Sequence, residues 1–163
     1  MLDATQNNAW ARELAGSRAA VVGAGRSGLA AARLLTAVGA SVRLLESAPQ
    51  ADAARLAGQV PGAEIVLGAH DPAHFADADW VVPSPGVPLR RIQPLLGDLP
   101  VERVIAEMEL AARFCSEPVL AVTGSNGKTT TVELASFVLQ ALGRRVFTGG
   151  NIGQPLSEYL LAA

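Results

Sequence analysis

The sequence predicts an α/β protein in which a parallel sheet carries helices on both faces. The main observation is that short apolar runs alternate along the chain with segments of helical periodicity. Two glycine-rich loops strengthen the prediction, because each lies between an apolar run and a helical segment, as phosphate-binding loops do. The 163 residues are 50% hydrophobic and only 4% aromatic, so we expect a core built from Ala, Val and Leu.

The first unit of the predicted sheet contains the earlier glycine loop. Residues 19–22 should form an apolar strand, residues 23–28 read Gly-Ala-Gly-Arg-Ser-Gly, and a helix should run from there to about Val38. A second strand over residues 41–45 is followed by Glu46, where dinucleotide-binding folds place an acidic residue. The pattern indicates a Rossmann-like domain that binds a nucleotide or nucleotide-sugar. Two alternatives stay open, namely an NAD-type site with Glu46 on the ribose and glycines that serve packing alone.

Further elements continue the alternation up to the second glycine loop. Strands are expected at residues 64–67, 79–82 and 101–105, and helices at residues 51–59, 91–96 and 107–114. Because such alternation places consecutive strands parallel to one another, we expect one sheet over this part of the chain.

The second glycine loop is the most specific motif in the chain. An apolar run, expected to be a strand over residues 119–122, leads into Thr123, Gly124, Ser125, Asn126, Gly127, Lys128, Thr129 and Thr130. A helix over residues 128–142 and a strand over residues 145–147 should follow. The N–H groups at the start of that helix would hold a phosphate, Lys128 would reach the terminal phosphates, and the Thr129 hydroxyl would ligate Mg²⁺.

Two other loops follow predicted strands, and ligands of parallel α/β sheets bind at the carboxyl ends of strands. Ser84, Pro85 and Gly86 come after one strand, where a hydroxyl and an N–H could hold a phosphate or a uracil edge. Asn151 lies in a Gly-Gly-Asn-Ile-Gly segment, residues 149–153, that should open beside the second glycine loop. Both segments also suit plain turns, because proline and glycine dictate turn geometry.

Two phosphate loops are too many for one small sheet, so we expect two domains. Residues 1–106 should form the Rossmann-like domain, and residues 107–163 the truncated start of a P-loop domain that is too short to bury a core of its own. Apolar surface near Val146 and Phe147 would then stay uncovered and favour self-association.

The composition excludes several classes of function. A net charge of −2 without a basic cluster argues against nucleic acid as a partner. The single cysteine, Cys115, rules out an internal disulfide and a cysteine-based metal site, and His70 and His74 lack a third ligand for zinc. No apolar run approaches the roughly 18 residues of a membrane span, and the first residues lack a signal-peptide pattern. We therefore expect a cytoplasmic protein.

The loops taken together resemble the Mur ligase family of ATP-dependent amide ligases. Residues 123–130 are similar to the family's ATP loop, and residues 84–88 and 149–153 are similar to segments of the member that adds D-glutamate. The resemblance extends from Val21 to about Leu156. It implies a Rossmann-like amino-terminal domain that binds a UDP group, not NAD, followed by the start of the family's central ATPase domain.

The resemblance also implies roles for individual residues. Those that would bind the UDP-linked substrate are Gly25, Arg26, Ser27, Glu46, Ser47, Ser84, Pro85, Gly86 and Asn151. ATP would be bound by residues 123–130, with Lys128 and Thr129 at the catalytic positions and Thr129 as a ligand of Mg²⁺.

The reaction that the resemblance implies is the ATP-dependent addition of D-glutamate to UDP-N-acetylmuramoyl-L-alanine through an acyl phosphate, in peptidoglycan precursor synthesis. The remaining catalytic residues and the domain that binds D-glutamate lie downstream in the family. We therefore expect these 163 residues alone to bind UDP ligands but not to catalyse the reaction. The competing hypothesis is a non-catalytic nucleotide-binding module or an NAD-type Rossmann domain.

Overall fold

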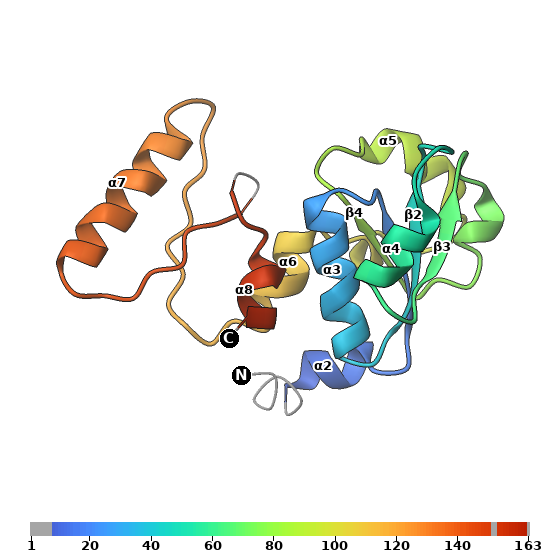
Figure 1. Cartoon of the computed structure of the whole chain (residues 1–163), viewed down its shortest axis with the longest axis horizontal. Coiled ribbons are helices and arrows are strands. Elements are labelled where there is room, and N and C mark those ends of the chain that lie inside the picture. The colour runs from blue at the N-terminus through green and yellow to red at the C-terminus, as the bar shows by residue number, and fades with distance from the viewer. Residues whose placement is uncertain (1–7, 151–152, 163) are drawn as a thin grey trace.

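The computed structural model describes residues 8–150 and 153–162, and a parallel β-sheet is its main structural feature (Figure 1). The strands of these residues are β1 (Arg18–Val22), β2 (Ser41–Glu46), β3 (Glu64–Leu67) and β4 (Trp80–Pro83). Their spatial order is β3-β2-β1-β4, and every neighbouring pair is parallel. The predicted α/β class with a Rossmann-like parallel sheet is confirmed.

The inner strand β1 is apolar on both faces, as expected when helices cover both sides of a parallel sheet. Ala19 and Val21 pack into one hydrophobic cluster, and Ala20 and Val22 pack into another. This division follows from the alternation of side chains along a strand. The sheet therefore separates two cores.

The larger core lies between the sheet and α3 (Arg26–Ala37), the helix that follows the first glycine loop. Small residues let this helix lie close to the sheet, since Ala30, Ala31 and Ala32 are fully buried. The same core includes side chains from α2 (Ala9–Leu14) and from two later helices, over residues 107–112 and 156–162, which pack against α3.

The smaller core lies on the opposite face and contains Phe75, Ile92 and Leu96. The predicted helix over residues 91–96 is replaced there by a short α-helix and a 3₁₀ turn. The helical elements between β2 and the end of this region are α4 (Ala53–Gln59), η1 (Pro72–His74), α5 (Leu89–Ile92) and η2 (Gln93–Leu95).

α6 (Glu107–Ala112) and α8 (Leu156–Ala162) pack against each other and against α3. The buried carboxylate of Glu107 accepts a hydrogen bond from the Ser157 N–H at 2.7 Å, in the first turn of α8. These helices thus tie the end of the chain to the sheet, although both belong to the segment that we assigned to a second domain. The boundary near Ala106 stays a prediction.

One predicted strand before that boundary is wrong. Residues 101–105 form the 3₁₀ helix η3 (Val101–Arg103) and then a single parallel bridge between Val104 and Val81. The Ile105 N–H still donates to the Val81 carbonyl at 3.0 Å. The apolar run therefore reaches the edge of the sheet but leaves it too soon to add a strand.

The predicted strands over residues 119–122 and 145–147 are also absent from the described structure. Val119 and Leu120 are 67% and 69% exposed, and no strand lies beside them to accept their backbone hydrogen bonds. The helix between them, α7 (Lys128–Ala141), forms as predicted but buries none of its residues. Figure 1 shows α7 standing away from the sheet.

Candidate functional site

The carboxyl edge of the sheet brings together three of the predicted binding segments. The register pairs Val22 of β1 with Leu45 of β2 and with Pro83 of β4, so the residues that follow these strands are neighbours. The Gly23 N–H donates to the Leu45 carbonyl at 2.7 Å, and the Ser84 N–H donates to the Val22 carbonyl at 2.8 Å. Backbone hydrogen bonds therefore fix the loop after β1 between the ends of β2 and β4.

Two of the three glycines in the first loop are required by packing. Gly23 has φ +94°, and an added Cβ there would lie 3.2 Å from Ser84 and Val87. A Cβ at Gly28 would lie 1.9 Å from the Gly23 carbonyl oxygen. The alternative that these glycines serve packing is thus correct for Gly23 and Gly28.

Gly25 differs from those two glycines, because an added Cβ would meet nothing within 4 Å. It is the N-cap of α3, and no side chain caps that end of the helix. The first N–H groups of a 12-residue helix therefore face an exposed loop, an arrangement that attracts a phosphate. Arg26 is exposed at the same helix start and pairs with no acidic residue in the described part of the chain.

Ser84, predicted to bind substrate, directs its hydroxyl into the protein. The residue is 9% exposed, and its Oγ donates to the Gly23 carbonyl at 3.0 Å. The turn that follows is closed by the Val87 N–H, which donates to the Ser84 carbonyl at 2.8 Å. Pro85 and Gly86 are exposed in this turn, beside the first glycine loop.

The Glu46 carboxylate also contacts the protein backbone. Oε2 accepts from the Ala24 N–H at 2.8 Å, and Oε1 accepts from the Ala48 N–H at 2.9 Å and from the Ser47 hydroxyl at 3.4 Å. Burial raises the pKa of the Glu46 carboxyl, but these donors together hold the pKa below its ordinary value. Glu46 is therefore a carboxylate at neutral pH.

The second glycine loop is a glycine turn before a helix, without the predicted strand ahead of it. Gly124 and Gly127 have φ of +143° and +77°, and Gly127 is the N-cap of the 14-residue α7. The Lys128 ammonium donates to the carbonyls of Gly124 and Ser125 in its own loop. Thr129 is exposed in the first turn of α7. Both loops thus end in a helix start that no side chain caps.

The remaining predicted substrate residue, Asn151, lies outside the described residues. The Gly149–Gln154 bridge beside it is formed, and the Gly150 N–H donates to the Gln154 carbonyl at 2.9 Å. A Cβ at Gly149 would lie 2.4 Å from that carbonyl oxygen. The glycine pair therefore has a packing role in this turn.

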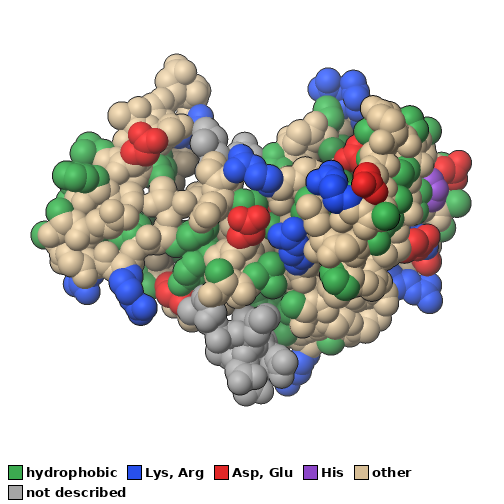
Figure 2. Space-filling model, viewed as in Figure 1, with side chains coloured by type: hydrophobic (Ala, Val, Ile, Leu, Met, Phe, Trp, Pro, Cys, Tyr) green, Lys and Arg blue, Asp and Glu red, His purple; other side chains and the backbone are tan. Residues whose placement is uncertain are grey.

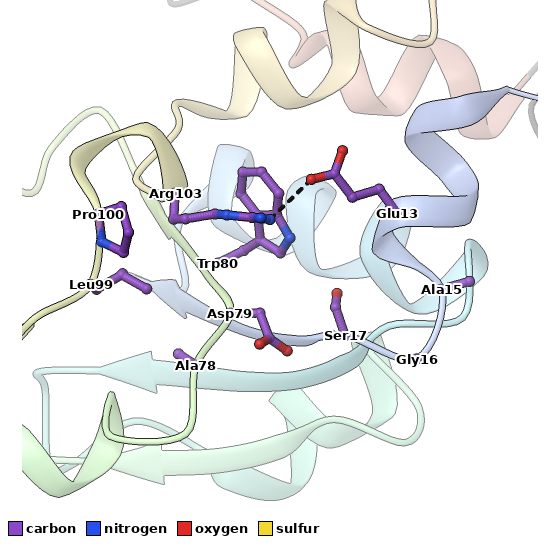
Figure 3. A pocket seen from close by; sticks show the side chains of 10 residues that line it. All are labelled: Glu13, Ala15, Gly16, Ser17, Ala78, Asp79, Trp80, Leu99, Pro100 and Arg103. Carbon is purple, nitrogen blue, oxygen red and sulfur yellow. Dashed lines mark hydrogen bonds and ion pairs between the residues drawn. The ribbon is translucent and has the colours of Figure 1, made fainter.

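A pocket that sequence reasoning missed lies at the opposite, amino edge of the sheet. Its volume is about 480 Å³, and none of the predicted site residues lines it. Figure 3 shows Arg103 extended across Trp80 toward Glu13, with an ion pair of 3.0 Å and 4.3 Å from the guanidinium to the indole centroid. Aromatic and charged residues far apart in sequence gave no signal of this contact.

The described residues contain neither a cluster of metal-binding side chains nor a helix that could span a membrane. Among the described residues no group of three His, Cys, Asp or Glu side chains could hold a metal ion. His74 Nδ1 accepts from the Asp71 N–H at 3.0 Å in a capping box. No helix in the described ranges is both long and apolar enough to cross a bilayer.

Comparison with known proteins relates the chain to the Mur ligases. Residues 17–96 match the family model described as Mur ligase MurD-like, N-terminal domain. The chain is 57% identical over 151 residues to the UDP-N-acetylmuramoylalanine–D-glutamate ligase of Nitratidesulfovibrio vulgaris, covering 90% of this chain and 34% of the relative. It is 55% identical over 152 residues to the enzyme of the same name from Desulfovibrio desulfuricans, with 90% and 35% covered.

A solved structure shows the same relationship. A pseudomurein peptide ligase type C from Methanothermus fervidus matches with a TM-score of 0.52 and 25% identity, over 78% of this chain and 27% of that one. The chain spans about a third of the length of the curated relatives it matches. Residues 17–96 thus carry a Mur ligase MurD-like amino-terminal domain, and the chain matches the amino-terminal portion of the MurD ligases.

Proposed function

We propose that this chain supplies the UDP-substrate site and the ATP loop of a ligase that joins D-glutamate to UDP-N-acetylmuramoyl-L-alanine, with ATP converted to ADP and phosphate. The observation that carries the proposal is the first glycine loop, in which only Gly25 is free of packing constraints and lies before an uncapped helix start. The relatives named for this reaction support the choice of substrate.

The UDP pyrophosphate would lie on the N–H groups at the start of α3, with Arg26 and Ser27 as side-chain donors. The backbone at Glu46 and Ser47, at the end of β2, would border the uridine, and the exposed turn at Pro85 and Gly86 would close the other side. A pyrophosphate suits this edge, since Arg26 adds a full positive charge to the partial positive charge of the helix start.

ATP would bind at the second loop. The N–H groups that open α7 and the Lys128 ammonium would hold its phosphates, after the ammonium leaves the loop carbonyls it now contacts. The exposed Thr129 hydroxyl fits one position of a Mg²⁺ ion, which usually keeps several waters and phosphate oxygens as its other ligands. When bound, that ion would neutralise phosphate charge during transfer.

The proposed reaction has two steps. The carboxylate of the L-alanine group attacks the γ-phosphorus of ATP, so that ADP leaves and an acyl phosphate forms. The amine of D-glutamate then attacks the acyl carbon, loses a proton, and displaces phosphate to leave the amide. This chain would contribute positioning and charge stabilisation, which are the main sources of catalysis in phosphoryl transfer. The proposal places this reaction in the cytoplasm.

These residues alone are proposed to bind UDP ligands, to bind ATP weakly and to form no amide. The described part offers no carboxylate cluster for a metal and no packed sheet under the ATP loop. Figure 2 shows hydrophobic side chains on the surface of the part that holds α7. Leu134 and Phe137 of this helix, and Leu142 directly after it, are each at least 62% exposed. Such a surface favours self-association at high protein concentration.

Thermal unfolding with added ligands tests the proposal. A ligand at 100 times its dissociation constant adds about 2.7 kcal/mol to the native state, which is several degrees for a domain of this size. UDP-N-acetylmuramoyl-L-alanine should raise Tm, and Arg26→Ala should remove much of that rise. NAD should have no effect. A rise with NAD and none with the UDP substrate would favour the dehydrogenase-type alternative and defeat the proposal.

A further inference from the structure

The first glycine loop is held in place from two sides by side chains that we had assigned to the ligand. Glu46 reaches it from the end of β2, and Ser84 reaches it from the end of β4. We infer that Glu46 and Ser84 are positioning residues, which brace the backbone of the loop so that Gly25 and the start of α3 are fixed before a ligand arrives. The inference rests on the proposed function only in taking a UDP group as the ligand.

The Ser84 brace is enclosed by the fold. A serine hydroxyl has one proton, and here it is donated to the Gly23 carbonyl at 3.0 Å. On the opposite side, a Cβ at Gly28 would come within 2.6 Å of Ser84 Oγ. The hydroxyl thus lies between the loop carbonyl and the first turn of α3, at a residue that is 9% exposed.

The Glu46 brace joins two loops. One carboxylate oxygen accepts from the Ala24 N–H at 2.8 Å, and the other accepts from the Ala48 N–H at 2.9 Å. The loop after β1 is thereby tied to the loop after β2. In an NAD-type site the acidic residue at this position presents its oxygens to the ribose hydroxyls, whereas here each oxygen accepts a backbone N–H.

Both contacts act on the free protein. Side chains from the strands on either side of β1 hold consecutive loop residues, Gly23 through its carbonyl and Ala24 through its N–H. A loop that is already ordered in the free protein loses less conformational entropy when the ligand binds, so the ligand binds more tightly. Removal of a brace should therefore weaken binding by loosening the free loop, without loss of a contact to the ligand.

Hydrogen exchange of the ligand-free chain, together with calorimetric titration with UDP, tests the inference. Ser84→Ala should speed exchange of the Ala24 and Gly25 amides although its side chain bonds to neither, and UDP affinity should fall about 2- to 10-fold, the range of one net hydrogen bond. Glu46→Ala should act more strongly. Glu46→Gln should fall between, because its single amide oxygen can serve only one of the two N–H groups.

Ser41→Ala is the matched control, since Ser41 is exposed at the other end of β2. It should change neither quantity, and the amides of Val21 and Val22 should keep their protection in every variant. Weaker UDP binding with unchanged loop exchange would show that Ser84 and Glu46 touch the ligand directly, and would overturn the inference. If the unmodified chain did not bind UDP, the proposed function would fail, and loop exchange alone would still decide whether the braces exist.

Discussion

The first glycine loop is enclosed by three strand ends, whereas the second stands in solvent with an exposed helix behind it. Gly23 and Gly28 touch neighbours that leave no room for a side chain, but a Cβ at Gly127 would meet nothing within 4 Å. The side of α3 that faces the sheet is mostly buried, whereas no residue of α7 is buried. The two loops thus share a local design, a glycine turn before an uncapped helix, and differ in tertiary support.

This difference shows which features of a phosphate loop depend only on nearby residues and which need tertiary contacts. The left-handed glycines and the helix starts form at both loops, because turn and helix geometry depend on nearby residues. The strand before the loop forms only at β1, where β2 and β4 supply hydrogen-bond partners. We therefore expect substitutions at the first loop to alter stability and UDP binding, and substitutions at the second to alter ATP chemistry alone.

The largest expected effect is on catalysis, through the second loop. In a complete ligase that contains this chain, Lys128→Ala should lower turnover about 100- to 1000-fold, because it removes a charge aimed at the transferred phosphoryl group. The measurement is steady-state kinetics of ADP release. UDP-substrate affinity should be unchanged, which separates the two loops. Near-normal turnover would show that the lysine does not act on the phosphates.

The next effect is on stability, through the first loop. Gly28→Ala should lower the free energy of unfolding by about 3 kcal/mol, since the new methyl group would overlap the Gly23 carbonyl and crowd Ser84. Urea unfolding followed by circular dichroism measures the loss. Gly25→Ala is the matched control and should cost less than about 1 kcal/mol, because its φ is −72° and its surroundings are open. Equal losses at the two positions would contradict the assignment of roles.

A smaller effect is expected where the end of the chain docks on the sheet. Glu107→Leu should cost about 1–3 kcal/mol, because the buried Ser157 N–H would lose its acceptor. Native-state hydrogen exchange should show early opening of α8, with β1 still protected. Glu107→Gln keeps an acceptor oxygen and should restore most of the protection. If α8 opened no faster in Glu107→Leu, its docking would not depend on this hydrogen bond.

The smallest effect concerns pH. Despite its burial, Glu46 has a folded-state pKa below the ordinary value of 4.5, owing to the Ala48 and Ala24 N–H groups. Its contribution to stability is therefore complete above about pH 4.5 and is lost as the pH falls through the folded-state pKa. Between about pH 6 and pH 3 the Tm of Glu46→Gln should fall less steeply than that of the unmodified chain. Parallel Tm curves would mean that the carboxylate gains nothing from these donors.

Much of the sheet region could be predicted from the sequence, because strand and helix patterns there agree with glycine positions. β1, β2 and α3 lie close to where residues 19–45 predicted them. The core is rich in Ala, Val and Leu as expected, yet Trp10 and Trp80 form an edge-to-face pair inside it with ring centroids 4.7 Å apart. Such a pair joins residues remote in sequence, so no local pattern reveals it.

The candidate site was predictable in its location but not in the roles of its residues. Spacing places Glu46 and Ser84 at strand ends, and parallel topology brings those ends together. Whether their side chains face a ligand or the loop backbone depends on contacts across three strands, which a sequence pattern does not contain. The buried hydrogen bond from the Ser157 N–H to the Glu107 carboxylate was missed for the same reason, since 50 residues separate the two partners.

The most direct test of the account is a hydrogen-exchange footprint of the UDP-N-acetylmuramoyl-L-alanine complex of this chain. Protection on binding should appear at residues 23–28, at Glu46 and Ser47 and at residues 84–87, while residues 123–130 should exchange as in the free chain. A footprint confined to the second glycine loop, or to the pocket lined by Trp80 and Arg103, would contradict the assignment of the UDP site to the carboxyl edge of the sheet.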